Sequence, residues 1–459
     1  MQRGRNTLIL LVLAAAIGAY SYFVESKHTP RSDAKGDAST EPRGKVFDKL
    51  DSTKIDDITV RGSAGETTHL KKTGNAWQIV EPSPGPVDDT EVSGLVSNLG
   101  TVEVNRTVDQ DPKDLTKYGL VKPRIDVQFT AGDKTVHQLQ IGSKTVTGGD
   151  LYAKRGNEKQ VILIPAYLES TFDRTTFQLR DKSILKFDRD KVDHVEVTSS
   201  AGALKFAKQG ETWKMTAPVA ARTDSAAVDT LIGRLATGQM KSVKAAEATP
   251  TDLAQYGLNK PNVEVNLVAG SARSGLLIGS AVDSGDTYAK DASRPMVFVV
   301  EKGISDDIKK SASDYRSKDV FDARAFTTTH LDVTRGGSTT VFDKTKVTEK
   351  DDKGKDKPPA DKWVQTTPAP AKPLDASKIE DVVGKITGLR ADGFVDKLPA
   401  GAAEFLTVNT KFDDGKKSEK VVISKAGDDY YAVRGDDAGA AKLASPAMVE
   451  AIKALDAAK

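Results

Sequence analysis

The sequence contains no cysteine, and this absence removes several kinds of chemistry at once. Disulfides, a thiol nucleophile, thiolate metal ligands and a lipid-modified N-terminal cysteine are all excluded. Histidine is scarce too, and no HExxH motif or other paired-ligand spacing occurs among the five residues. The five are His28, His69, His137, His194 and His330. We therefore expect no metal site and no cofactor.

Neither sign of charge is in excess, because 67 Lys and Arg residues stand against 65 Asp and Glu residues. A nucleic-acid binder usually carries a basic domain or stripe, so no nucleic-acid partner is expected. The GxSxG elbow of serine hydrolases is also missing. Residues 142–145, Gly-Ser-Lys-Thr, resemble a phosphate-binding loop, but that loop needs Gly next to Lys and here Ser143 intervenes. We predict a strand-ending turn there, and no small-molecule substrate.

One apolar run without charge, Thr7 to Val24, begins the chain. As a helix it would be about 27 Å long, enough to cross a hydrocarbon core. Arg3 and Arg5 precede it, which predicts a cytoplasmic N-terminus. A cleaved signal peptide and a buried core helix are the alternatives, but the run is long for a signal peptide and lacks a small-x-small exit.

A single-pass anchor in the inner (cytoplasmic) membrane therefore leads, with residues 1–24 as cytoplasmic tip and anchor. Residues 25–45 have no apolar periodicity and are rich in Ser, Asp, Lys and Pro, which predicts a flexible tether. The bulk of the chain is then expected in the periplasm or extracytoplasmic space.

Internal repetition is the most informative signal in the remainder. The segment DLTKYGLVKP at residues 114–123 returns as DLAQYGLNKP at residues 252–261, with seven of ten positions identical. Trp77 and Trp213 precede the two segments at matching distances, and Leu-x-Ile-Gly and Tyr-Ala-Lys follow both. These matches predict two copies of one structural unit.

A third, divergent copy is indicated by a helical stripe of apolar residues at i, i+3, i+4 and i+7, which occurs three times. The stripes are Val92, Leu95, Val96 and Leu99; Val228, Leu231, Ile232 and Leu235; and Ile379, Val382, Val383 and Ile386. The third follows Trp363 and lacks the YGL segment, and a charged insertion at 347–360 predicts an extended hairpin loop. Phe-Asp pairs at 47, 187 and 321 place the repeat units at 46–186, 187–320 and 321–459.

Within the first unit, alternating apolar residues predict strands around Ile55–Val60, His69, Trp77–Val80, Ile125–Phe129, Val136–Ile141, Leu151–Lys154 and Val161–Ile164. A stripe helix capped by Asp88 or Asp89, a short helix over Pro112–Tyr118 and a closing helix after Pro165 are expected between or after them. The fold class is thus α+β. We predict an N-terminal transmembrane helix followed by three tandem repeats, each a mostly antiparallel β-sheet with two or three helices.

The recurring motif residues have a structural and a functional interpretation. They are Trp77, Tyr118, Gly119, Leu120, Pro123, Trp213, Tyr256, Gly257, Leu258, Pro261 and Trp363. In the structural interpretation Tyr and Leu pack, Gly supplies a left-handed turn and Pro rigidifies the entry to a strand. In the functional one an exposed tyrosine contacts a partner or glycan. The structural interpretation is favoured, and no catalytic residue is expected.

The YGL box, the Trp hairpin and the Ile-Gly and Tyr-Ala-Lys strands, behind an N-terminal anchor, resemble the bacterial family catalogued as domain of unknown function 4340. Members tend to be exported, anchored proteins encoded beside exporters of the ATP-binding-cassette type, including the gliding-motility kind. The resemblance implies a non-enzymatic scaffold or auxiliary binding subunit with a membrane-protein partner of the transporter-permease type. An envelope hydrolase or glycan-binding protein acting on cell-wall or surface polysaccharide, and a passive spacer, are the alternatives.

Overall fold

The computed structural model describes residues 44–458, except residues 133, 201, 349–354, 356–359, 370–371 and 374–375. The expected anchor at Thr7–Val24, nearly all of the tether and most of the charged insertion lie outside the described residues. Among the residues that are described, no helix has both the length and the apolar character needed to span a membrane. By its internal contacts the chain divides into two compact units. The first holds the described residues up to Ile55 with Gly94–Asp173, and the second holds Asp56–Ser93 with Arg174–Lys459.

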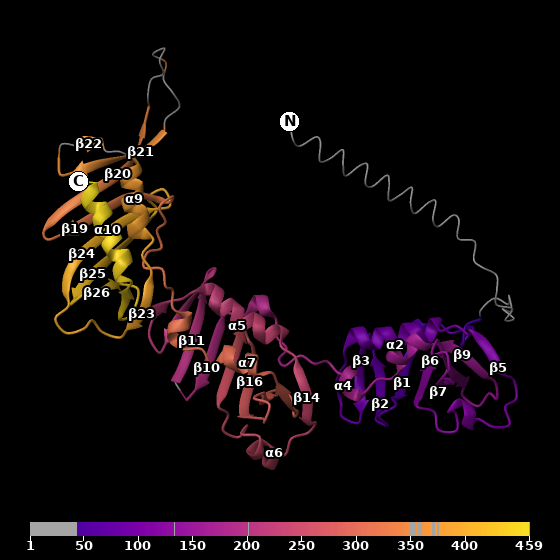
Figure 1. Ribbon diagram of the computed structural model, residues 1–459. Helices are drawn as coiled ribbons and strands as arrows, with labels where there is room; N and C mark the ends of the chain where they lie inside the picture. The colour runs from indigo at the N-terminus through magenta and orange to yellow at the C-terminus, as the bar shows by residue number, and fades with distance from the viewer. Residues whose placement is uncertain are drawn as a thin grey trace. The chain divides into compact units, whose positions relative to one another are not determined.

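Three nine-stranded sheets make up the described chain, and the colours of Figure 1 distinguish them by residue number. The first has the strand order β4-β3-β2-β1-β6-β7-β8-β9-β5. Its strands are β1 (Ile55–Arg61), β2 (Thr67–Thr73), β3 (Ala76–Glu81), β4 (Gly85–Pro86), β5 (Arg106–Asp109), β6 (Ile125–Ala131), β7 (Val136–Lys144), β8 (Asp150–Arg155) and β9 (Val161–Pro165). Its helices are η1 (Ser52–Lys54), α2 (Asp89–Thr101), η2 (Thr116–Tyr118), η3 (Ala166–Leu168), α3 (Glu169–Phe172) and α4 (Thr176–Leu179).

The second sheet repeats this order as β13-β12-β11-β10-β15-β16-β17-β18-β14. Its strands are β10 (His194–Ser199), β11 (Gly202–Gln209), β12 (Thr212–Ala217), β13 (Ala221–Arg222), β14 (Met240–Ala245), β15 (Val263–Ala269), β16 (Ala272–Ala281), β17 (Thr287–Asp291) and β18 (Val297–Val300). The helices are η4 (Arg189–Lys191), α5 (Ser225–Thr237), α6 (Pro250–Gln255), α7 (Lys302–Ile308) and α8 (Ala312–Tyr315). Helix α5 packs against β12, α7 and α8.

The third sheet has the same order again, β22-β21-β20-β19-β24-β25-β26-β27-β23. Its strands are β19 (Thr328–Arg335), β20 (Ser338–Val347), β21 (Ala360–Thr367), β22 (Lys372–Pro373), β23 (Ala391–Val395), β24 (Ala403–Phe412), β25 (Lys417–Ala426), β26 (Asp429–Arg434) and β27 (Ala440–Leu443). Helices α9 (Ala376–Thr387) and α10 (Ser445–Ala457) pack against each other on one face of this sheet (Figure 1). The mostly antiparallel α+β architecture predicted from the sequence is therefore confirmed.

Alternation of side chains explains how each sheet is covered on one face. Along β6 and β15 buried residues alternate with more exposed ones, as the period of a strand requires. The apolar stripe of α5 is buried in the same core as β15, and that of α9 lies in the core beneath α10. The stripe helices predicted from the sequence thus supply one layer of the core and the sheets supply the other.

The short helix of the first copy is shorter than predicted. Instead of starting at Pro112, η2 begins at Thr116, because the Asp114 side chain accepts a hydrogen bond from the Thr116 amide at 2.7 Å and forms a local turn. In the second copy Thr249 and Asp252 make a capping box, and α6 starts in full at Pro250.

Candidate functional site

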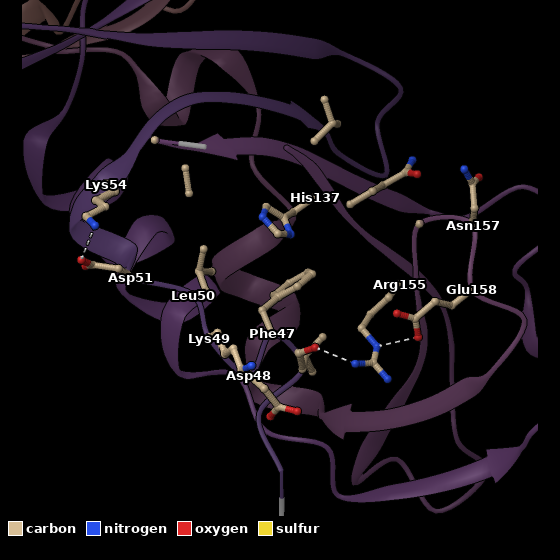
Figure 2. Close-up of a pocket in the computed structure, with 16 residues that line it drawn as sticks. Phe47, Asp48, Lys49, Leu50, Asp51, Lys54, His137, Arg155, Asn157 and Glu158 are labelled. Atoms are coloured by element: carbon tan, nitrogen blue, oxygen red, sulfur yellow. Dashed lines mark hydrogen bonds and ion pairs between the residues drawn. The ribbon is translucent and has the colours of Figure 1, made fainter. Parts of the chain in front are cut away.

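A pocket of about 1110 Å³ opens at one end of the first sheet, within the first compact unit (Figure 2). This is the end at which β6 turns into β7 and at which β8 finishes. The lining residues come from the segment 46–54 that leads into the sheet, from the β6–β7 turn and from the turn after β8. The pocket therefore lies where the described chain enters its first repeat.

Three aromatic rings pack together beside this pocket. The Phe47 ring stands edge-on to Phe129 at 5.1 Å and to His137 at 5.7 Å, and the His137 ring stacks on Phe129 at 5.1 Å. Phe47 and His137 are half-buried and line the pocket, where Figure 2 shows their rings close together. Such edge-to-face and offset pairs hold the rings in place and leave a firm apolar wall.

Arg155 fixes the segment that carries Phe47. Its guanidinium donates to the carbonyl oxygen of Val46 at 3.1 Å and pairs with Glu158 at 3.0 Å (Figure 2). It also donates to the side chain of Gln160 at 3.1 Å. The Val46 amide in turn donates to the carbonyl of Val102 at 2.8 Å. The entering segment is thus held on both sides, which positions Phe47 for the pocket.

The rim of the pocket is charged, with both signs present. Asp51 caps η1, and hydrogen bonds from the Thr53 hydroxyl and amide hold the pKa of its carboxyl below the ordinary value. The Lys54 ammonium lies 3.9 Å from Asp51, while Asp48 and Lys49 are exposed beside it. The rim can therefore meet polar groups of either sign on a ligand.

Charged and polar side chains share the lining with the aromatic wall. The described residues around the pocket include no Ser, Thr, Cys or Tyr. Across the described chain, no group of three or more His, Cys, Asp or Glu side chains is placed to hold a metal ion. Of the histidines, His69 and His330 each pair with an aspartate across neighbouring strands, at 2.9 and 2.7 Å. The pocket thus presents an apolar wall and a polar rim.

The second copy does not reproduce the aromatic wall. In the pairing of β15 with β16, Ser274 occupies the place of His137 and Leu267 that of Phe129. The Ser274 hydroxyl donates to the carbonyl of Lys186 at 3.1 Å. The wall is therefore a feature of the first copy rather than of the shared sheet.

An arginine holds the entering segment in every copy, and sequence comparison missed it. The guanidinium groups reach backbone carbonyls of that segment: Arg155 that of Val46 at 3.1 Å, Arg294 those of Ser183 and Ile184 at 2.8 Å each, and Arg434 that of Val320 at 3.0 Å. The amides of Val46, Ile184 and Val320 each donate to a carbonyl just after the stripe helix, which marks equivalent positions, so Phe47 matches Leu185 and Phe321. Asp51 and Asp188 occupy the N-cap positions of equivalent 3-10 helices. The Phe187-Asp188 pair accordingly corresponds to Leu50-Asp51, not to Phe47-Asp48.

The tyrosines of the YGL boxes pack inside their own copies. Tyr118 is buried, its ring centre lies 5.0 Å from that of Tyr152, and its hydroxyl donates to Asp109 at 3.0 Å. Tyr256 is half-buried and contacts Tyr288 at 4.5 Å. The adjoining leucines, Leu120 and Leu258, are buried, while Pro123 and Pro261 are half-buried two residues before β6 and β15.

The resemblance at 142–145 to a phosphate-binding loop has a structural origin. Gly119 and Gly257 adopt left-handed φ angles of 67° and 69°, and a β-carbon on either would collide with Ser143 or Ser280 on the neighbouring strand. A β-carbon on Gly142 would collide with the carbonyl of Tyr118. The box and the Ile-Gly-Ser strand end therefore form one interlocked structure. Lys144 pairs with Glu169 at 2.5 Å.

The tryptophans occupy matching strands. Trp213 on β12 and Trp363 on β21 are buried, and Trp77 on β3 is half-buried. The Trp213 indole donates to Asp229 of α5 at 2.9 Å, which ties the strand to the stripe helix. The structure thus brings tyrosine, glycine and leucine of each box together, whereas the tryptophans belong to separate hairpins.

Solved structures offer little likeness to this chain. Two crystal structures of the DNA polymerase sliding clamp from Pseudomonas aeruginosa match with 10% and 8% identity and TM-scores of 0.16 and 0.15. The matches cover 87% and 85% of this chain and 93% and 91% of those chains. TM-scores this low carry no argument about fold or function. No curated protein matches the chain.

One protein-family model matches the chain twice, over residues 77–212 and again over 213–407. The two matches together cover more than half of the chain. They include both YGL boxes and all three tryptophans, the residues on which the resemblance was based. The chain therefore belongs to the family described as Domain of unknown function (DUF4340).

Proposed function

We propose that this chain is a membrane-anchored, extracytoplasmic scaffold or auxiliary binding subunit. Its partner would be a membrane protein of an ATP-binding-cassette exporter or of gliding or envelope machinery. The observation that carries the proposal is the threefold use of one nine-stranded sheet order, which gives a repeated framework for binding surfaces. The apolar run Thr7–Val24 behind Arg3 and Arg5 supports an anchor with the sheets outside the cytoplasm.

The pocket of the first copy is the surface that we assign to the partner. Phe47 and His137 offer a fixed apolar wall, and Val136 beside them has 65% of its surface exposed. Exposed Lys49 and Asp48 supply polar contacts at the rim. An apolar centre with a polar rim is the usual anatomy of a protein-binding site. The pocket follows directly on the tether, so a membrane-protein loop could reach it.

The alternative of an envelope hydrolase gains no support from this pocket. A glycosidase needs two carboxyl groups placed about the scissile bond. Of the three acids that line the pocket, Asp51 accepts hydrogen bonds from Thr53, Glu158 pairs with Arg155, and Asp48 is exposed at the rim. A binding role explains the same residues without an added catalytic group.

Photo-crosslinking in intact cells tests the proposal. A photoreactive amino acid replaces Lys49 on the pocket rim, and a matched variant carries it at Lys186, the exposed lysine of the equivalent segment in the second copy. We expect the first variant to form an adduct with an integral membrane protein, and the second to form several-fold less. Adducts in neither variant, or equal adducts in both, contradict the pocket assignment. An adduct with polysaccharide would favour the glycan-binding alternative instead.

A further inference from the structure

The first sheet carries exposed apolar side chains at the end opposite the pocket. Val121 has 63% of its surface exposed, Val146 has 105% and Tyr167 has 71%. Val121 precedes β6, Val146 lies in the turn between β7 and β8, and Tyr167 follows β9. We call this set of three residues the apolar end.

The strand register places these residues at the same end of the sheet. Ile125 at the start of β6 pairs with Ile141 near the end of β7, and Asp150 at the start of β8 pairs with Pro165 at the end of β9. In an antiparallel sheet these four strand ends must lie together. The Ala166 amide donates to the carbonyl of Gly149 at 3.0 Å, which joins the segment of Tyr167 to the turn of Val146.

The second copy has the same framework without the apolar residues. After the shared Tyr-Gly-Leu, Asn259 stands in the place of Val121. The β7–β8 and β16–β17 turns close with matching hydrogen bonds, Gly148 to Thr145 and Gly285 to Val282 at 2.8 Å each. Asp283 therefore stands in the place of Val146. Buried Leu168 and Ile304 match after the last strand, which puts Gly303 in the place of Tyr167.

The apolar end also differs from the second copy in charge. Arg124 and Lys144 both pair with Glu169, so two cations share one carboxylate. The corresponding residues of the second copy are Asn262 and Ala281, which are uncharged. Lys122 is exposed beside Val121. Compared with the second copy, the first has three more apolar side chains, two more cations and the carboxylate of Glu169 at this end, and it lacks the acid at Asp283.

We propose that the apolar end docks onto the surface of a lipid bilayer containing anionic phospholipid. Valine tips would enter the boundary of the acyl chains, and tyrosine favours the headgroup level. The excess of Arg and Lys matches an anionic headgroup layer. Residues 25–43 would reach roughly 65 Å when extended, which is long enough to let this end meet the membrane. Docking goes beyond the proposed function, because the apolar end would contact lipid even in a chain released from its anchor.

The absence of cysteine makes a direct test possible. Val146→Cys carries a polarity-sensitive fluorophore, and Asp283→Cys carries it at the equivalent turn of the second copy. The full chain is reconstituted into vesicles of phosphatidylcholine alone or with phosphatidylglycerol. With phosphatidylglycerol we expect a blue-shifted emission and several-fold stronger quenching by a lipid-borne quencher at position 146 than at position 283.

A variant with two substitutions separates docking of the apolar end from anchoring of the chain. Val121→Asn with Tyr167→Gly introduces the residues of the second copy, which that copy accommodates at equivalent positions, and circular dichroism checks the fold. These changes should abolish the shift at position 146 while the chain still floats with the vesicles. Equal signals at positions 146 and 283 in both lipids would overturn the proposal. So would a label at position 146 that responds only when membrane proteins are added, which would indicate a protein partner.

Discussion

Gly142 on β7 stands so close to the carbonyl oxygen of Tyr118 that a β-carbon at this position would overlap the oxygen. Gly279 bears the same relationship to Tyr256 in the second copy, where the Ser280 amide also donates to the Tyr256 carbonyl at 2.9 Å. Because the obstacle is backbone in both cases, a rotamer change cannot relieve it. The two motifs recognised separately in the sequence are therefore the halves of one packed junction.

Gly142→Ala should consequently destabilise the first unit. Forcing a methyl group against the backbone moves the YGL turn away from the strand and costs about 2–3 kcal/mol. Gly149→Ala is the matched control, because a β-carbon there has no atom within 4 Å. Chemical denaturation followed by fluorescence measures both variants. Equal midpoints for the two would contradict the interlock.

Leu120→Ala tests whether the YGL box is architectural. Leu120 is buried with Tyr118 and Val161, so truncation leaves a cavity that costs about 2–4 kcal/mol. The neighbouring Val121→Ala changes an exposed side chain and should alter the free energy of unfolding by less than about 0.5 kcal/mol. If Leu120→Ala leaves the melting temperature unchanged but abolishes partner association, the box is a recognition site instead.

The arginine of the third copy should be the costliest of the three to remove. Arg434 and Glu419 are 7% and 4% exposed at the side chain, and they pair directly. Arg434→Met strands the buried Glu419 carboxylate and should destabilise the protein by about 3–5 kcal/mol. Adding Glu419→Gln removes that charge and should restore part of the loss, since the amide oxygen can still accept one of the two hydrogen bonds that the Asp322 and Ala323 amides donate to the carboxylate. A double variant no more stable than Arg434→Met would contradict this account.

Acid should weaken the ion pairs that Glu169 makes with Lys144 and Arg124. The Lys144 hydrogen bond, aided by Arg124 and opposed by burial, holds the pKa of Glu169 below its ordinary value of 4.5. A group with a lowered folded pKa stabilises the protein above its unfolded pKa, and the stabilisation disappears as pH falls through the folded value.

Glu169→Gln should therefore cost about 1 kcal/mol at pH 7, because the partner cations are partly solvated. The cost should vanish below the folded pKa of Glu169. Unfolding midpoints measured between pH 7 and 2.5 give the comparison. If the difference in unfolding midpoint between the unchanged protein and Glu169→Gln stays constant from pH 7 to 2.5, protonation of Glu169 does not affect stability.

The sequence predicted those elements whose signal is local. The apolar stripes identified α2, α5 and α9, and alternation located most of the strands that pair in hairpins. The strands β5, β14 and β23, of four to six residues, were missed. Their partners β9, β18 and β27 lie far along the chain, and no local period marks such edge strands.

The pocket was not predictable for the same reason. Phe47, His137 and Arg155 lie on three separate segments, and only the pairing of β6, β7 and β8 brings them together. The arginines at 155, 294 and 434 were also obscured, because Arg155 and Arg434 are the last residues of β8 and β26, whereas Arg294 lies in the turn after β17. Comparing the sequence copies at a constant residue offset detects the residues of the YGL junction. It does not detect an arginine that contacts backbone carbonyls from different positions in each copy.

The central claim is an anchored protein whose sheets lie outside the cytoplasm, and one measurement addresses it directly. Alkaline phosphatase is fused after Lys459, and its activity is assayed in the carbonate-washed membranes and the soluble fractions of cells expressing the full chain. The account predicts activity that remains with the washed membranes, as Thr7–Val24 behind Arg3 and Arg5 would impose. An inactive fusion, or activity released into the soluble periplasmic fraction, would contradict it.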